Sequence, residues 1–241
     1  MAERLHKVLS AAGIASRRAA EALIREGRVA VNGIRVTRPV VLVEESDLIA
    51  VDGKVIDRRP TRRYLMLHKP AGFVTTLRDT HGRRTVSDLV KAVPERVFPV
   101  GRLDCASEGL LLMTNDGDFA LRVQHPRFQI PKTYLVLAGG RVTGGDLKTL
   151  AGGLVLEDGP FVPRAVAVKE ARDEGTWLEM TVTEGRNRVI RRAMRTLGYP
   201  VRRLIRVAVG DVRLGTLRPG RYRDLTAEER QSLMNYWKKY P

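Results

Sequence analysis

Cysteine, aromatic side chains and acidic side chains are all scarce in this sequence of 241 residues. The single cysteine, Cys105, excludes a disulfide framework and a structural zinc site built on cysteines, and it predicts a reducing compartment. Aromatic residues make up 5%, so binding by rows of stacked aromatics is not expected. No apolar run approaches the roughly 20 residues of a membrane span, and the N-terminus lacks the apolar core of a signal peptide. We expect a cytoplasmic protein with no membrane partner.

The shortage of acids leaves a large positive charge. Against 27 Asp and Glu stand 43 Lys and Arg, a formal net charge of +16. Residues 1–63 hold 13 basic and 8 acidic side chains, whereas residues 185–223 hold 12 arginines, no lysine and one acid, Asp211. Lys and Arg neutralise phosphates, and the planar fork of arginine suits phosphates and base edges. The charge therefore favours a polyanionic partner over a small metabolite.

Residues 1–57 are predicted to form a small first domain. Apolar residues recur at helical spacing before Gly13, and Ser16 is placed to cap a second helix that ends at Gly27. Alternating apolar residues around Asn32-Gly33 predict a hairpin. The polar, proline-containing residues 58–63 are predicted to be a linker.

Residues 64–241 are predicted to form a mixed α+β domain, because short strands and helices interleave without one repeating order. The expected strands are Tyr64–Leu67, Gly109–Thr114, Thr133–Val136, Trp177–Val182 and Val207–Leu214. The expected helices are Val86–Ala92, Asp118–Gln124, Gly145–Leu150 and Asn187–Leu197.

A glycine-bracketed loop before an apolar strand holds one acid, Asp104. A carboxylate held there is partly desolvated and stays ionised only beside a cation, which makes Asp104 a possible nucleophile. On physical grounds alone, an aspartate that hydrogen-bonds its own loop is the commoner arrangement. Tyr134, at the start of a strand, is similarly either a half-buried strand residue or a platform for a base.

A second informative stretch is the expected helix at Asn187–Leu197, with Asn187 as its cap and Gly198 as its stop. One face of this helix is apolar, and the other carries Arg188, Arg191, Arg192 and Arg195. These arginines repel one another, and no acid lies between Glu184 and Asp211. A polyanion or an inward-facing carboxylate would offset that repulsion.

Several blocks, taken together, resemble RsuA/RluB-type ribosomal RNA pseudouridine synthases. Gly101-Arg102-Leu103-Asp104, with Ser107 and Gly109-Leu110-Leu111-Leu112, resembles their catalytic motif, although the family more often has Thr at position 107. Tyr64–Gly72, Lys132-Thr133-Tyr134 and Glu184–Arg188 resemble further blocks in the same order. Residues 1–57, with Ala15-Ser16-Arg17-Arg18, resemble an S4 RNA-binding domain. The resemblance covers nearly the whole chain and implies a mainly antiparallel sheet in the second domain.

The resemblance also implies roles. Asp104 matches the aspartate that attacks the target uridine, and Tyr134 matches the aromatic that packs on the uracil and serves in proton transfer. Arg191 matches the cation that pairs with the carboxylate, and Arg102 matches the arginine that helps to extrude the nucleotide. No cofactor and no metal are implied. The remaining residues expected to bind RNA are Arg17, Arg18, Arg186, Asn187, Arg188, Arg192 and Arg195.

Three functional interpretations follow. The first is a synthase acting on large-subunit (23S) ribosomal RNA, free or in a pre-ribosomal particle, because Arg203–Val207 and Gly210-Asp211 look most like the RluB branch. The second is a small-subunit (16S) synthase. The third is a non-catalytic S4-domain assembly factor. The presence of Asp104, Tyr134 and Arg191 together argues against it, because a protein that only binds RNA has no need of these three residues. Nothing in the sequence demands more than a monomer.

Overall fold

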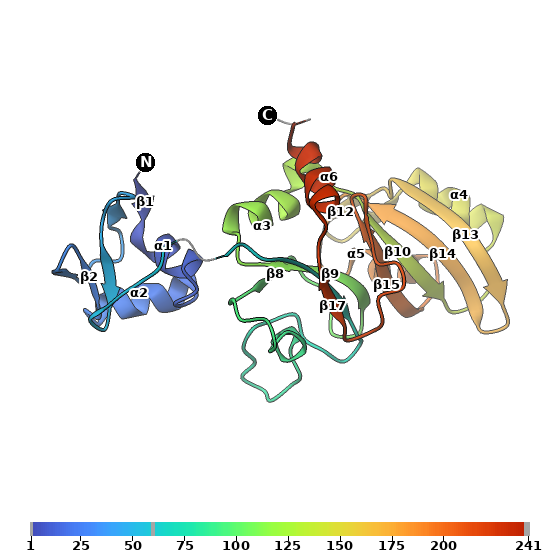
Figure 1. The fold of residues 1–241 in the computed structure, drawn as a ribbon. Coiled ribbons are helices and arrows are strands. Elements are labelled where there is room, and N and C mark those ends of the chain that lie inside the picture. The colour runs from blue at the N-terminus through green and yellow to red at the C-terminus, as the bar shows by residue number, and fades with distance from the viewer. Residues whose placement is uncertain (1, 59–60, 239–241) are drawn as a thin grey trace. The chain divides into compact units, whose positions relative to one another are not determined.

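The computed structural model describes residues 2–58 and 61–238, which form two compact units (Figure 1). The first takes in the chain up to Arg63 together with Val93–Val97 and Asn115–Gly117. The second takes in Tyr64–Ala92, Phe98–Thr114 and the chain from Asp118 onward. Part of the predicted linker, residues 59 and 60, lies outside the described residues.

The first unit combines two short helices with small sheets. Its elements are β1 (Glu3–Arg4), α1 (Leu5–Ala11), α2 (Arg17–Arg25), β2 (Val29–Val31), β3 (Ile34–Val36), β4 (Leu42–Val43), β5 (Ile49–Val51) and β6 (Lys54–Val55). The strands β3-β2-β5-β6 form one antiparallel sheet, and β1 pairs with β4.

The expected local signals of the first unit are present. The hydroxyl of Ser16 accepts a hydrogen bond from the amide of Ala19 at 3.2 Å and so caps α2. Asn32 and Gly33 both have positive φ, 52° and 81°, as a tight hairpin turn requires. The buried face of α2, including Ile24, joins Leu5 and the sheet in one apolar core.

The second unit is built on a nine-stranded sheet. Its strands are β7 (Tyr64–Lys69), β8 (Phe98–Val100), β9 (Glu108–Thr114), β10 (Lys132–Ala138), β11 (Leu154–Leu156), β12 (Gly159–Phe161), β13 (Ala165–Arg172), β14 (Gly175–Val182), β15 (Val201–Val209), β16 (Val212–Arg213) and β17 (Tyr222–Asp224), of which β11 and β12 form a separate pair. Its helices are the single turns η1 (Val86–Leu89) and η2 (Pro126–Phe128), and α3 (Gly117–Gln124), α4 (Gly144–Gly152), α5 (Val189–Thr196) and α6 (Ala227–Lys238).

The order of the main sheet is β13-β14-β10-β15-β9-β7-β17, with β8 added to β9 and β16 to β15 (Figure 1). Among the described strands of this sheet, β15 and β9 are the one parallel pair, so the expected mainly antiparallel sheet is confirmed. Two apolar cores pack on it, one around Leu110 and Phe119 and the other around Val136 and Ile190.

Two predicted elements of this unit are wrong in extent. Val207–Leu214 is not one strand: β15 ends at Val209, Gly210 turns the chain with a φ of 55°, and β16 returns antiparallel. Val86–Ala92 is a single turn, η1, rather than a helix. Thr85 and Asp88 form a capping box that begins the turn, and the chain leaves the helical conformation at Val90, which has a φ of −121°.

The helix expected at Asn187–Leu197 begins later than predicted. Arg188 has φ 49° and ψ 28°, a left-handed conformation that an α-helix of L-residues does not contain, so α5 begins at Val189. Asn187 is therefore not the helix cap, which corrects the sequence-based expectation. Gly198, with φ 84°, follows the end of the helix as predicted.

The parallel contact between β9 and β15 explains Gly109. This glycine lies opposite Arg206 and has a φ of 106°. A Cβ built on it would lie 2.2 Å from the carbonyl oxygen of Arg206, which is backbone and cannot move aside. Only glycine lets the two strands approach here, immediately after the loop that carries Asp104.

We predict that Gly109→Ala destabilises the protein by about 3 kcal/mol or more, because it combines a strained backbone with a steric clash. Urea unfolding of the variant and the wild type would measure the difference. Gly144→Ala is the matched control, since nothing lies within 4 Å of a Cβ there, and its effect should stay below about 0.5 kcal/mol. Similar losses for the two variants would contradict the close-approach explanation.

Candidate active site

The loop between β8 and β9 carries Asp104, which is half-buried. Gly101 turns the chain out of β8 with a φ of 75°. Leu103 is buried, and its backbone is held on both sides by the hydroxyl of Thr75, which accepts from its amide at 3.2 Å and donates to its carbonyl at 2.6 Å. The amide of Ser107 donates to the carbonyl of Asp104 at 3.0 Å, closing the loop. Asp104 is thus attached to a rigid turn.

Lys69, at the end of β7, binds the backbone of this loop. Its side chain is fully buried, and its Nζ lies 2.7–3.3 Å from four carbonyl oxygens, those of Pro70, Asp104, Cys105 and Ser107. Burial lowers the pKa of Lys69 to about 8, although the charges of Asp104 and other nearby groups raise it. No role for Lys69 follows from the sequence alone, where the only signal is a lysine at the end of a mostly apolar strand in the block Tyr64–Gly72.

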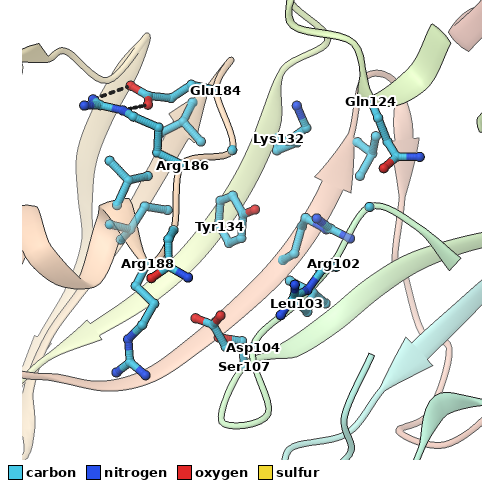
Figure 2. Close-up of a pocket in the computed structure, with 18 of the residues that line it drawn as sticks. Arg102, Leu103, Asp104, Ser107, Gln124, Lys132, Tyr134, Glu184, Arg186 and Arg188 are labelled. Atoms are coloured by element: carbon cyan, nitrogen blue, oxygen red, sulfur yellow. Dashed lines mark hydrogen bonds and ion pairs between the residues drawn. The ribbon is translucent and has the colours of Figure 1, made fainter. Parts of the chain in front are cut away.

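A cavity of about 450 Å³ adjoins the loop, a volume within the range of small-ligand pockets. Lys132 and Tyr134 project into it from β10 (Figure 2). In that view Tyr134 lies between Lys132 and Asp104. The predicted site residues that line the cavity are Arg102, Asp104, Tyr134, Arg186, Asn187 and Arg188. A carboxylate and an aromatic ring thus share one cavity, as the sequence-based hypothesis requires.

Arg191 takes a different place from the one expected. Its guanidinium donates to the carbonyl of Val201 at 3.1 Å, to the carbonyl of Ala106 at 3.2 Å and to the hydroxyl of Ser107 at 3.4 Å. Within residues 2–58 and 61–238 it forms no ion pair with Asp104 within 4.0 Å. Arg191 therefore binds the loop beyond Asp104 rather than the carboxylate. Burial lowers the pKa of Arg191, as does the nearby Arg188, while the charge of Asp104 opposes the shift.

Two of the predicted RNA-binding arginines are already paired. Arg192 makes a bidentate contact with Asp158 at 2.7 and 2.8 Å, and Arg186 binds both Asp158, at 2.9 Å, and Glu184. The sequence analysis left a polyanion or a carboxylate as the group that offsets the repulsion between these arginines, and for Arg186 and Arg192 it is the carboxylate of Asp158, from the turn between β11 and β12, some 30 residues before the helix. Sequence distance hid this counter-ion.

The other predicted cations are open to solvent. Arg102, Arg188 and Arg195 are exposed, and so are Arg17 and Arg18 in the first turn of α2. None of the five is within 4.0 Å of an acid in the described part of the chain. Arg195 lies on α5 outside the cavity lining, and Arg17 and Arg18 belong to the first unit. Their positive charge is available to an external anion.

The described residues contain no group of three or more His, Cys, Asp or Glu side chains arranged to hold a metal ion. Within the same ranges, no helix has the length and apolar character needed to cross a bilayer. A carboxylate on a rigid loop, facing a cavity rimmed by arginines, describes the active site of an enzyme that acts on a phosphate-bearing polymer.

Comparison with known proteins identifies that class more closely. A family model for RNA pseudouridylate synthases matches residues 63–196, and an S4 domain model matches residues 3–49. An uncharacterized RNA pseudouridine synthase of Aquifex aeolicus (strain VF5) is 47% identical over 232 residues, covering 95% of this chain and 92% of that protein. Ribosomal large subunit pseudouridine synthase B of Bacillus subtilis (strain 168) is 40% identical over 229 residues, covering 94% and 93%.

A crystal structure of a pseudouridylate synthase, 29% identical, superimposes with a TM-score of 0.69 over 95% of this chain and 99% of that one. The chain therefore belongs to the RNA pseudouridylate synthase family and carries an S4 domain near its N-terminal end. The predicted class, an isomerase that acts on RNA, and the predicted fold are both confirmed.

The pKa of Lys69 predicts how stability depends on pH. The folded protein releases this proton near pH 8, whereas the unfolded chain holds it up to the ordinary value of 10.5, so the unfolded state binds more protons between these values. Relative to Lys69→Met, the wild type should gain up to about 3 kcal/mol as pH rises through this window. Urea unfolding of both proteins at several pH values would measure it.

Lys148→Met is the control for this experiment, because Lys148 is exposed on α4. Measured at the same pH values, it accounts for the general effect of replacing a lysine by methionine. A constant difference between the wild type and Lys69→Met would show that Lys69 titrates normally and is not a desolvated anchor of the loop.

Proposed function

We propose that this protein converts one uridine of large-subunit (23S) ribosomal RNA to pseudouridine, with Asp104 as the nucleophile. The observation that carries the proposal is that Asp104 and Tyr134 line one cavity of nucleotide size beside the exposed Arg102 and Arg188. Two relatives, from Bacillus subtilis and Yersinia pestis, are named ribosomal large subunit pseudouridine synthase B and are each 40% identical, which favours the large subunit over the small one.

The reaction is an isomerisation, so no atom is gained or lost. The carboxylate of Asp104 attacks C1′ of the target uridine, the bond between N1 and C1′ breaks, and the uracil rotates while it stays in the cavity. C5 then attacks C1′, so the bond between C5 and C1′ forms as the bond between C1′ and the Asp104 carboxylate breaks. The proton on C5 leaves, N1 takes a proton, and the free carboxylate is restored. We assign Tyr134 to packing on the uracil, where its hydroxyl also serves in proton transfer. Lys69 and Arg191 are positioning residues, because they bind the loop carbonyls and Ser107.

The target base must leave its helix before it can enter this cavity, which costs a few kcal/mol of stacking. We assign that work to Arg102 at the rim, and phosphate binding to Arg17, Arg18, Asn187, Arg188 and Arg195. Arg186 and Arg192 are assigned a different role, because Asp158 and Glu184 already hold their guanidinium groups. They hold the loop that presents Arg188 to the RNA.

The remaining assignments are also part of the proposal. We place the S4 domain at residues 1–57, the linker at 58–63 and the catalytic domain at 64–241. The protein acts as a monomer in the cytoplasm, where its single cysteine stays reduced. The non-catalytic assembly factor is set aside, because the family match spans the catalytic block.

The choice of substrate can be tested directly. We expect site-resolved pseudouridine mapping of ribosomal RNA, with and without the gene, to show the loss of one pseudouridine from 23S RNA. Complementation with the wild-type gene should restore it. Loss of a pseudouridine from 16S RNA instead would show that the small-subunit RNA is the substrate. An unchanged map of both RNAs would contradict ribosomal RNA as the substrate.

The role of Asp104 can be tested by Asp104→Asn, which keeps the shape and removes the anion. We expect product formation to fall at least about a thousandfold while RNA affinity is unchanged or tighter, since a negative charge near the RNA is lost. Single-turnover assays and filter binding would measure the two quantities. Asp173→Asn, in the exposed turn between β13 and β14, is the control and should behave as the wild type. Retained turnover in Asp104→Asn would exclude Asp104 as the nucleophile.

A further inference from the structure

The wall of the cavity contains two cations that the proposed mechanism does not use, Lys132 on β10 and Arg206 on β15. The register between these antiparallel strands places Arg206 opposite Tyr134, and Lys132 lies two residues before Tyr134 on the same strand. Side chains two apart on a strand, and those directly opposite on its neighbour, share one face of the sheet. All three line the cavity, and Figure 2 shows Lys132 and Tyr134 projecting from one strand.

Neither cation has an acidic partner. In the described part of the chain, no Asp or Glu lies within 4.0 Å of Lys132 or Arg206. The Nζ of Lys132 donates to the carbonyl of Ile130 at 3.2 Å, and the Nε of Arg206 donates to the carbonyl of Leu110 at 2.7 Å. Lys132 is half-buried and Arg206 is buried.

Among the described residues, the lining of the cavity contains two acids, Asp104 and Glu184, and neither forms an ion pair with Lys132 or Arg206. Glu184 is bound by Arg186, and Asp104 is the proposed nucleophile. The charged residues of the lining are Arg102, Asp104, Lys132, Glu184, Arg186, Arg188 and Arg206, so positive charge exceeds negative. Two partly desolvated cations on one face of the sheet repel each other, which is unfavourable. The pKa of Lys132 is accordingly lowered to about 8, by burial and then by Arg206. An anion bound between them would relieve both effects.

We propose that Lys132 and Arg206 form a phosphate site inside the cavity, which binds a phosphodiester next to the uridine that packs on Tyr134. This inference rests on the proposed function and assigns these two residues a positioning role in it. Two residues along a strand span about 6.6 Å. Lys132, which binds the phosphate, and Tyr134, which packs on the base, are therefore separated by a distance comparable to the size of one nucleotide. Lys132 and Arg206 therefore hold the phosphate of the nucleotide while Tyr134 holds its base, and the two contacts together fix the position of the nucleotide relative to Asp104.

The test uses the full-length protein and an RNA oligonucleotide that contains the uridine found by mapping. Two further oligonucleotides replace the 5′ or the 3′ phosphate of that uridine with a neutral methylphosphonate. For the wild type, one replacement should lower affinity about tenfold, the size of one charge-assisted hydrogen bond. Lys132→Met should bind the native oligonucleotide about tenfold more weakly, and the same methylphosphonate should change its affinity by less than about twofold.

Lys132→Arg should restore most of the affinity and the sensitivity to the methylphosphonate, whereas Lys148→Met should match the wild type throughout. If the effects of Lys132→Met and the methylphosphonate multiply, or if neither methylphosphonate weakens the wild type, Lys132 does not bind a phosphate. The second outcome would instead indicate contacts with the neutral uracil.

A measurement on the wild type covers the case in which Lys132→Met does not fold. The NMR signal of the Lys132 Nζ should report a rise in its pKa on binding uridine monophosphate, and no rise with uridine. Equal responses to the two compounds would overturn the phosphate site. This titration needs no turnover. If the wild type makes no pseudouridine in the native oligonucleotide, the proposed function fails, while the phosphate site is still decided by the titration.

Discussion

The position of Asp104 depends on the buried ammonium of Lys69. The carbonyls of Asp104, Cys105 and Ser107 all accept from this one cation, and those of Asp104 and Cys105 also accept from the amides of Ser107 and Gly72. The ammonium is itself costly to bury, and the same carbonyls offset that cost. Cation and loop therefore stabilise each other, and the result is a carboxylate whose backbone is fixed while its side chain remains half-exposed to the cavity. Arg191 adds to this arrangement by binding the carbonyl of Ala106 and the hydroxyl of Ser107 in the same loop.

The arginines of the catalytic domain divide into two groups with different physical roles. Arg186 and Arg192 both form ion pairs with Asp158, and these pairs join the turn between β11 and β12 to the loop before α5 and to α5 itself. Arg188 stands between them in the sequence, in a left-handed conformation, and remains exposed without an acid partner among the described residues. The pairing of its neighbours is what allows a strained residue to persist.

Local chemistry made much of the fold predictable. Ser16 as a cap, Asn32-Gly33 as a hairpin turn and the apolar strand at Gly109–Thr114 all depend on neighbours in the sequence, and the structure has them. Strand β13 escaped prediction because its residues are mostly exposed at a sheet edge, so no alternation marks it. The extent of β15 was misjudged because Val201–Val209 mixes exposed arginines with buried residues, and its burial depends on β9, about 95 residues away.

The candidate site was likewise predictable where it depends on residues close together in the sequence, and not where it depends on distant ones. The resemblance located the residues of the cavity, but it could not show which arginines have counter-ions, because Asp158 lies far away in the sequence. Nor could it show that Lys69 and Arg191 both bind the loop rather than the carboxylate. These contacts separate two functions of positive charge, namely to build the loop and to attract the substrate. Lys69 and Arg191 each bind two or more oxygens of the loop, and Arg186 and Arg192 bind Asp158. Lys132 and Arg206 each donate to a single carbonyl and have no acid within 4.0 Å among the described residues, so the proposed phosphate site uses their charge together with that of the exposed Arg102 and Arg188. Charge that the fold leaves unneutralised marks the path that a phosphate backbone would follow toward Asp104.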